Sequence, residues 1–314
     1  MQKIIYTLLV IGAFAAAASA QEQAVYSQYQ VYPILINPGV TGFGDEHQFL
    51  VNARRTWAGF PGTPTTFTFM YNGPVGDKLA LGGGLFSEKI GSINTVRLQG
   101  NYAFRFRIQK TQIGLGLSTE FLRRQANSNL LGNPIVDPRD AVLEDIVSNQ
   151  QIFDASLGAH VLYDNRLFVG LALPNAIRAR LDQVQLPGEE NSGLFQHYVF
   201  QLGYVINAQA QGFKVIPSLA LRNVRDVPYQ IDLNVQGRFI EDKLIAGLTF
   251  RPSTGGSMAF MIGSKYNSMQ LLYSYDVSFG PFQQYTGGSH EISLSYALAR
   301  KKKPGTEPSE QSYK

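Results

Sequence analysis

The feature that most constrains this chain is an alternation of apolar and polar residues that recurs from about Gln48 to Leu298. In Tyr229–Gln236 every odd position is apolar and every even position is polar. Successive side chains of a β-strand point to opposite faces, so this segment has one apolar and one polar face. A soluble sandwich also alternates, but here about fourteen such segments of about ten residues follow an export leader. We therefore predict an all-β fold, a transmembrane antiparallel β-barrel of about 14 strands of the outer-membrane type.

Residues 1–20 are predicted to be a signal peptide. Lys3 supplies the positive region, Ile4–Ala17 supplies the apolar region, and Ala18-Ser19-Ala20 fits the small-residue cleavage site, so the mature chain is expected to begin at Gln21. The alternative, an N-terminal membrane anchor, would need a longer apolar run. No cysteine follows the leader, which argues against a lipid anchor.

The composition is compatible with a barrel and disfavours other classes. The chain has no Cys, and a closed barrel without sheet edges can be held by backbone pairing alone. Mean hydropathy is −0.09, as expected where half of each strand faces a polar lumen. No apolar run after the leader approaches the roughly 20 residues of a spanning helix. A net charge of +4, concentrated in the C-terminal tail, is too mild to indicate a nucleic-acid partner.

The alternation defines individual strands, separated by short segments rich in Gly, Asn and Asp. The predicted spans are 47–54, 65–72, 79–87, 95–106, 112–123, 152–163, 167–174, 197–207, 214–222, 229–239, 243–250, 257–266, 269–277 and 289–298.

The same alternation assigns the two faces of the barrel. Apolar sets that are expected to face lipid are Phe67/Phe69/Tyr71, Val96/Leu98/Tyr102/Phe104, Tyr198/Phe200/Leu202/Tyr204/Ile206, Met258/Phe260/Ile262, Leu271/Tyr273/Tyr275 and Ile292/Leu294/Tyr296/Leu298. A charge at the lipid midplane costs about 2–4 kcal/mol for Arg or Lys, so charged residues of the strands are expected in the lumen. These candidate lumen residues are Arg97, Arg105, Glu120, Asp154, His160, Asp232, Lys265, Asp276 and Glu291. Because both signs occur, pairing inside the lumen and an open channel both remain possible.

The connections predict the orientation. Barrels of this type have short periplasmic turns and longer surface loops. Connections 73–78, 108–111, 164–166, 208–213, 241–242 and 267–268 are short and alternate with the others, among them 124–151 and 175–196, the two longest. The long connections fall on one side, which we take as the cell surface.

The segments outside the strands have their own interpretations. Residues 21–46 form a lead-in that is either a flexible periplasmic stretch or a segment that folds into the barrel and plugs its lower mouth, and the apolar residues Val31–Ile36 favour the second. The barrel is expected to occupy 47–299. Residues 300–314, with Lys301-Lys302-Lys303, are expected to be a disordered basic tail in the periplasm.

Several motifs resemble one known family. They are Ser27-Gln28-Tyr29, Ile36-Asn37-Pro38, Thr41-Gly42, Arg54 with Trp57-Ala58-Gly59-Phe60-Pro61-Gly62-Thr63-Pro64, Asn72-Gly73-Pro74, Leu81–Leu85, Lys89-Ile90-Gly91 and His290–Tyr296. Over essentially the whole mature chain the sequence resembles the PorP/SprF family of type IX secretion system outer-membrane proteins of Bacteroidota. Asn37, Pro38, Trp57 and Gly59 carry the more specific part of the resemblance. The chain departs from the family at Gly39-Val40, where Ala-Tyr is more frequent, and at Leu298, where a final aromatic is more usual of barrels.

The resemblance implies a non-enzymatic protein of the outer membrane that assists type IX secretion and anchors an exported surface protein such as an adhesin, in some members for gliding. The implied partners are outer-membrane lipid, that exported protein and periplasmic components of the secretion machinery. The alternative is a porin or channel for small solutes. No cofactor, nucleic acid or small-molecule substrate is expected.

Three features allow sharper hypotheses. Trp57, the single Trp, is expected to pack at the membrane interface or the barrel mouth, with a contact to an exported partner as the alternative. Asp137, Asp140, Glu144 and Asp145 lie in the longest loop, but the ligand spacing of a calcium loop is missing, so a solvated acidic loop is favoured. His47, His160, His197 and His290 are scattered over different strands and match no catalytic or metal motif, so we expect no enzyme.

Overall fold

The computed structural model describes residues 26–126, 147, 149–181, 197–208, 212–223, 229–252 and 256–300. The signal peptide, the acidic cluster of the longest loop and the basic residues 301–303 therefore lie outside the described residues. Over the described part no helix is long and apolar enough to cross a membrane.

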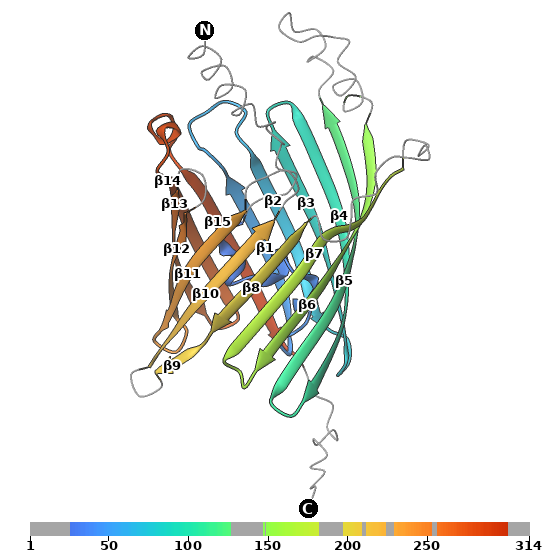
Figure 1. Ribbon diagram of the computed structural model, residues 1–314, viewed down its shortest axis with the longest axis vertical. Helices are drawn as coiled ribbons and strands as arrows, with labels where there is room; N and C mark the ends of the chain where they lie inside the picture. The colour runs from blue at the N-terminus through green and yellow to red at the C-terminus, as the bar shows by residue number, and fades with distance from the viewer. Residues whose placement is uncertain are drawn as a thin grey trace, which may run out of the picture.

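The protein is a closed antiparallel barrel of 14 strand positions (Figure 1). Its strands are β1 (Glu46–Arg55), β2 (Thr65–Pro74), β3 (Leu79–Ile90), β4 (Ile93–Ile108), β5 (Thr111–Ala126), β6 (Gln150–Tyr163), β7 (Leu167–Arg180), β8 (Tyr198–Tyr204), β9 (Ile206–Ala208), β10 (Phe213–Asn223), β11 (Gln230–Phe239), β12 (Leu244–Arg251), β13 (Ser257–Tyr266), β14 (Met269–Ser278) and β15 (Ser289–Ala299). Strands that follow one another in the chain pair, except that β8 and β9 both pair with β10, and β15 pairs with β1 from Glu46–Ala299 to Arg55–His290, which closes the wall. The predicted strands are confirmed, each within a few residues except for the end of β7.

Two strands differ from the prediction. The predicted strand 197–207 is divided at Val205 into β8 and β9, although both parts keep one register against β10. Pro217 of β10 would face Tyr204 in that register and has no backbone N–H to donate, which explains the gap. Strand β7 continues past its predicted end at 174 to Arg180, and the register of β6 against β7 shifts between Ala155 and Leu157.

The short connections gather at one end of the barrel. In the β6–β7 turn Asp164 and Asn165 have φ angles of 51° and 56°, the left-handed pair that a tight hairpin of type I′ requires. The connections between β5 and β6 and between β7 and β8 lie at the opposite end. We call these the periplasmic end and the surface end, following the orientation expected from the connection lengths.

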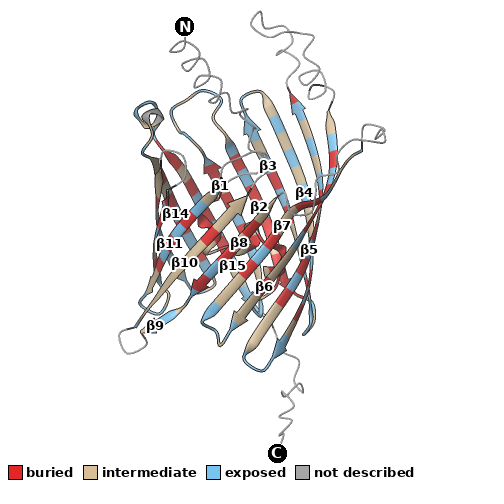
Figure 2. Ribbon diagram, viewed as in Figure 1, coloured by how far each residue is buried: buried red, intermediate tan, exposed pale blue. Residues whose placement is uncertain are grey.

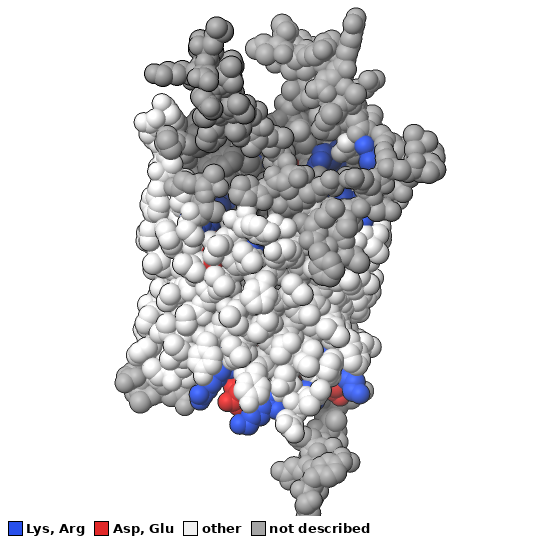
Figure 3. Space-filling view, viewed as in Figure 1, with Lys and Arg blue, Asp and Glu red and all other residues white. Residues whose placement is uncertain are grey.

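Exposed and buried residues alternate along the strands (Figure 2). The exposed set is apolar and includes Phe67, Leu98, Tyr102, Phe260 and Leu294. Figure 3 shows a broad uncharged band on this face, with charged side chains below it and others visible above it. Both observations match an outer surface that is solvated by lipid.

The described part of the lead-in, residues 26–45, lies inside the barrel. It forms three short 3-10 helices, η1 (Gln28–Gln30), η2 (Pro33–Leu35) and η3 (Pro38–Val40). Proline at the first position of η2 and η3 supplies a fixed φ and lacks only an N–H that would have no helical partner there. Their residues are buried or half-buried against the inner wall, so the lead-in forms a plug. A further 3-10 helix, η6 (Pro281–Tyr285), lies between β14 and β15.

Candidate functional site

The candidate site is the lumen together with the plug that occupies it. Near the surface end, Ser27 is held by charged residues from several strands. Its backbone N–H donates to Glu291 Oε2 over 2.8 Å, and its hydroxyl donates to Asp276 Oδ2 over 2.6 Å. Arg54 bridges the same two carboxylates, with Nη1 at 2.9 Å from Glu291 and Nη2 at 2.8 Å from Asp276. The plug is thus fixed to β1, β14 and β15 at one point.

The charged cluster continues to β11 and β12. Arg251 lies 3.2 Å from Asp276 and 3.3 Å from Asp232. Tyr29 of the plug donates its hydroxyl to Asp232 over 2.9 Å and accepts from Asn234 over 3.0 Å. Every charged side chain in the cluster is at most 8% exposed. Removing one partner of such a buried set leaves an uncompensated charge at a cost of about 3–5 kcal/mol. The cluster therefore holds Ser27 and Tyr29 of the plug in one strongly preferred position.

An apolar cluster holds the middle of the plug. Tyr26, Tyr32 and Ile34 pack with inward-facing apolar residues of the wall, which are Leu50, Met70, Phe86, Ile245, Met261 and Leu272. The Tyr32 hydroxyl donates to Ser295 over 2.9 Å and accepts from Gln270 over 2.9 Å. The inner face of the wall is therefore not uniformly polar, and its apolar positions mark where the plug is bound.

A row of glycines seats η3 against β5 and β6. The Asn37 amide donates to Ala159 O over 3.0 Å, and its oxygen accepts from the Gly39 N–H over 2.8 Å. A Cβ at Gly116 would collide with the Pro38 carbonyl, and a Cβ at Gly158 would collide with the Asn37 amide. Glycine is required at these wall positions because the plug backbone lies directly on the strands.

The plug leaves the lumen at the periplasmic end. Arg105 donates to the carbonyl of Gly42 and lies 3.0 Å from the Asp45 carboxylate. The backbone N–H of Arg300 donates to Asp45 O over 3.2 Å, and its guanidinium lies 3.1 Å from Asp77. These contacts join the end of the plug, the β2–β3 turn and the residue that follows β15.

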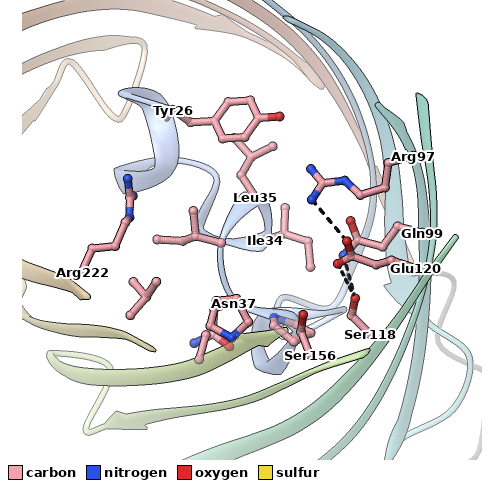
Figure 4. Close-up of a pocket in the computed structure, with 15 residues that line it drawn as sticks. Tyr26, Ile34, Leu35, Asn37, Arg97, Gln99, Ser118, Glu120, Ser156 and Arg222 are labelled. Carbon is pink, nitrogen blue, oxygen red and sulfur yellow. Dashed lines mark hydrogen bonds and ion pairs between the residues drawn. The ribbon is translucent and has the colours of Figure 1, made fainter. Parts of the chain in front are cut away.

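A small cavity remains between the plug and the wall of β4–β7 (Figure 4). Its volume is about 60 Å³, room for a few water molecules. Ile34 and Leu35 lie on its plug side, whereas Arg97, Glu120 and Ser118 form its polar wall. Arg97 donates to Glu120 over 3.2 Å, and Glu120 also accepts from Ser118 over 2.9 Å. The cavity thus lies beside the plug, with the plug forming one of its sides.

The remaining predicted lumen residues also lie on the inner face. Asp154 faces Glu120 on β5 and Arg178 on β7 in the strand register. The His160 ring packs edge-on against Phe43 of the plug, with 4.7 Å between ring centroids. Lys265 is half-buried near the periplasmic end of β13, apart from the charged cluster.

The Trp57-Ala58-Gly59 loop lies at the surface end and is tied to the connection before β15. Ala58 donates its N–H to Gly288 O over 2.7 Å, and Gly287 donates to Ala58 O over 2.6 Å. Trp57 has a φ of 53° and is 46% exposed, and its backbone N–H donates to Ser289. The loop therefore forms a fixed edge of the surface mouth.

Sequence reasoning missed Arg54 and Arg251 as lumen residues, and with them the cluster around Ser27. Arg54 shares the inner face of β1 with Leu50 and Asn52, so alternation alone could have found it. Arg251 is the last residue of β12, one position beyond the predicted strand end. Among the residues that the structure describes, no group of three His, Cys, Asp or Glu side chains is placed to hold a metal ion.

Comparison with known proteins adds the family. Residues 18–296 match the family described as type IX secretion system membrane protein PorP/SprF. No curated protein matches the sequence.

Solved structures with a similar fold are outer-membrane proteins. The monoaromatic hydrocarbon channel CymD has a TM-score of 0.51 at 10% identity, over 91% of this chain and 96% of that chain. A FadL homologue of Pseudomonas aeruginosa gives a TM-score of 0.47 at 13% identity, over 84% of this chain and 92% of that chain. Acinetobacter baumannii Omp33 gives 0.46 at 10% identity, over 82% of this chain and 100% of that chain. At these identities the similarity to CymD concerns the fold alone.

Proposed function

Because this chain belongs to the PorP/SprF family of type IX secretion system membrane proteins, we propose that it assists the export of a partner protein and anchors that partner at the cell surface. An adhesin, in some cells one that serves gliding motility, is the partner that the family motifs suggest. The periplasmic end of the barrel would contact the trans-periplasmic components of the secretion machinery.

The observation that carries this proposal is the occupied lumen. The plug packs closely on β5 and is hydrogen-bonded to β6 on one side, and it is hydrogen-bonded to β11, β12, β14 and β15 on the other, so it bridges the barrel. A porin needs a continuous polar bore, and a bridging segment that is hydrogen-bonded to a buried cluster of ion-paired wall residues supports a scaffold role instead. The alternative of a solute channel gains no support from the similarity to CymD, which concerns the fold.

The surface end supplies a rigid frame for a partner. Strands β4 and β5 are 16 residues long, and β6 and β7 are 14 residues long, so this side of the wall reaches furthest. The two longest connections begin and end on β5–β8, and binding surfaces usually lie on loops that a rigid scaffold positions. We propose that the connections 127–146 and 182–196 make the partner contacts.

The proposal is tested by display of the partner on cells. In a strain that lacks the chain, the wild-type gene is compared with a variant in which 127–146 is replaced by a short Gly/Ser linker. The matched control carries the same linker inserted between Asn267 and Ser268, in a periplasmic turn. Both barrels should fold and shift on heating in gels, but only the surface variant should lose adhesin from intact cells and retain less of it on co-purification.

Two results would contradict the proposal. Normal display of the adhesin by a strain that lacks the chain would contradict the proposed role in secretion. If the strain without the chain loses display but the loop variant displays the adhesin normally, the partner must contact another part of the surface mouth, such as the Trp57 loop. The proposed role in secretion would then still hold.

A further inference from the structure

The direction in which the plug crosses the lumen has a topological consequence. Strand β15 shows this direction, because three parts of the plug contact it or the residue after it in the same order as their residue numbers. Ser27 bonds to Glu291, the third residue of β15 from the surface end. Tyr32 bonds to Ser295, four residues further on, and Asp45 accepts from Arg300, just past the strand's periplasmic end. The plug therefore runs steadily from the surface end to the periplasmic end as residue numbers increase.

The plug spans the full thickness of the barrel. From Glu291 to Arg300 is about 31 Å of strand at ~3.4 Å per residue, or roughly 23 Å along the barrel axis for a tilt of about 40°. The outward apolar band of such barrels is about 25 Å tall. Tyr26, the first described residue, therefore lies at the level of the outer interface and not in the periplasmic half.

The surroundings of Tyr26 leave little room for the chain to turn back. Its side chain is 2% exposed, and its hydroxyl bonds at 2.9 Å to Thr68, three residues from the surface end of β2. The space below it is occupied by Tyr32, Ile34 and their apolar partners on the wall. The Ser27 N–H, which is on the amino-terminal side of that residue, donates to Glu291 near the surface end of β15.

We propose that the plug carries the amino-terminal end of the mature chain through the barrel, so that the residues before Tyr26 emerge on the cell surface. On this proposal the amino terminus is accessible from the cell surface and not from the periplasm. The leader must be cleaved before the plug is seated, because a chain held in the inner membrane could not place Tyr26 at the outer interface.

The experiment uses the absence of cysteine in the wild-type chain. Ala24→Cys is expressed in cells and treated with a maleimide coupled to a polyethylene glycol too large to enter the lumen. We expect labelling on intact cells. Ser309→Cys, in the tail, is the control and should react only after the outer membrane is permeabilised.

Labelling of Ala24→Cys only after permeabilisation would overturn the proposal, as would its protection under both conditions. Heat-modifiability on gels and protection of Ile34→Cys in the same preparation show that barrel and plug are folded. Because the readout is location and not display of a partner, its failure is distinguishable from failure of the proposed secretion role.

Discussion

Replacing Gly116 by Val should expel the plug while leaving the wall intact. Valine favours strands more than glycine does, so β5 itself should not be weakened. Its Cβ, however, would lie within the space of the Pro38 carbonyl and the Gly39 nitrogen, which are backbone atoms that cannot rotate away. The conflict therefore falls on the bound plug alone.

The size of the effect follows from two contributions. Overpacking a tight contact costs about 1–3 kcal/mol. Displacing Asn37 also breaks its bond to Ala159 O, at about 1 kcal/mol. The total of about 2–4 kcal/mol corresponds to a roughly 30- to 700-fold increase in the population with an open plug.

The assay is maleimide labelling of Ile34→Cys, a position that is 4% exposed in the plugged state. The labelling rate should rise by the factor above in Gly116→Val, and planar bilayers should show new conductance. Gly100→Val on β4 is the matched control, because its Cβ has no atom closer than 3.6 Å and does not point at the plug. Equal labelling rates in the two variants would refute the glycine seat.

Three further outcomes are expected. Arg54→Met removes the cation that pairs with Glu291 and leaves Asp276 with Arg251 alone, so it should favour plug opening by about 3–5 kcal/mol, measured by the same labelling; an unchanged rate would show that the cluster does not hold the plug. Cysteine at Asn127 or Ser192 should label on intact cells, whereas cysteine at Asn165 should not, and labelling at Asn165 would reverse the orientation. Truncation after Arg300 retains that residue's contacts to Asp77 and Asp45 and removes only the basic tail; if the tail merely anchors the strand end, each inserted copy should still display the partner, whereas loss of display with normal insertion would indicate a periplasmic docking role.

The strands and their faces could be predicted because alternation is a local property. The alternation within Tyr229–Gln236 is enough to assign its two faces without any other segment. Phe67 and Leu98, which the same pattern places on the outer face of their strands, are exposed. Even the end of β7 was missed for a local reason. Pro174 and Asn175 look like a strand end, but a shift of register in the neighbouring strand carries the pairing past them.

The plug could not be placed in the same way, because its partners are distant in sequence. Ser27 meets Glu291 across 264 positions, and nothing in Gly116 or Gly158 distinguishes a plug seat from an ordinary strand glycine. Apolar residues on the inner face, such as Leu50 and Leu272, are the one local signal that something apolar lies within the lumen. The orientation in the membrane, the signal peptide and the tail stay predictions.

The direct junction of the plug to β1, at Asp45–Glu46, makes the plug an intramolecular ligand of its own barrel. A segment tethered this closely acts at an effective concentration of about 1 mM or more. A free peptide at about 1 μM that bound the lumen equally well would therefore be at a disadvantage of roughly 10³-fold, or about 4 kcal/mol. Exchange of the plug for another polypeptide thus requires a competitor that is itself held at the barrel, or work supplied from outside it.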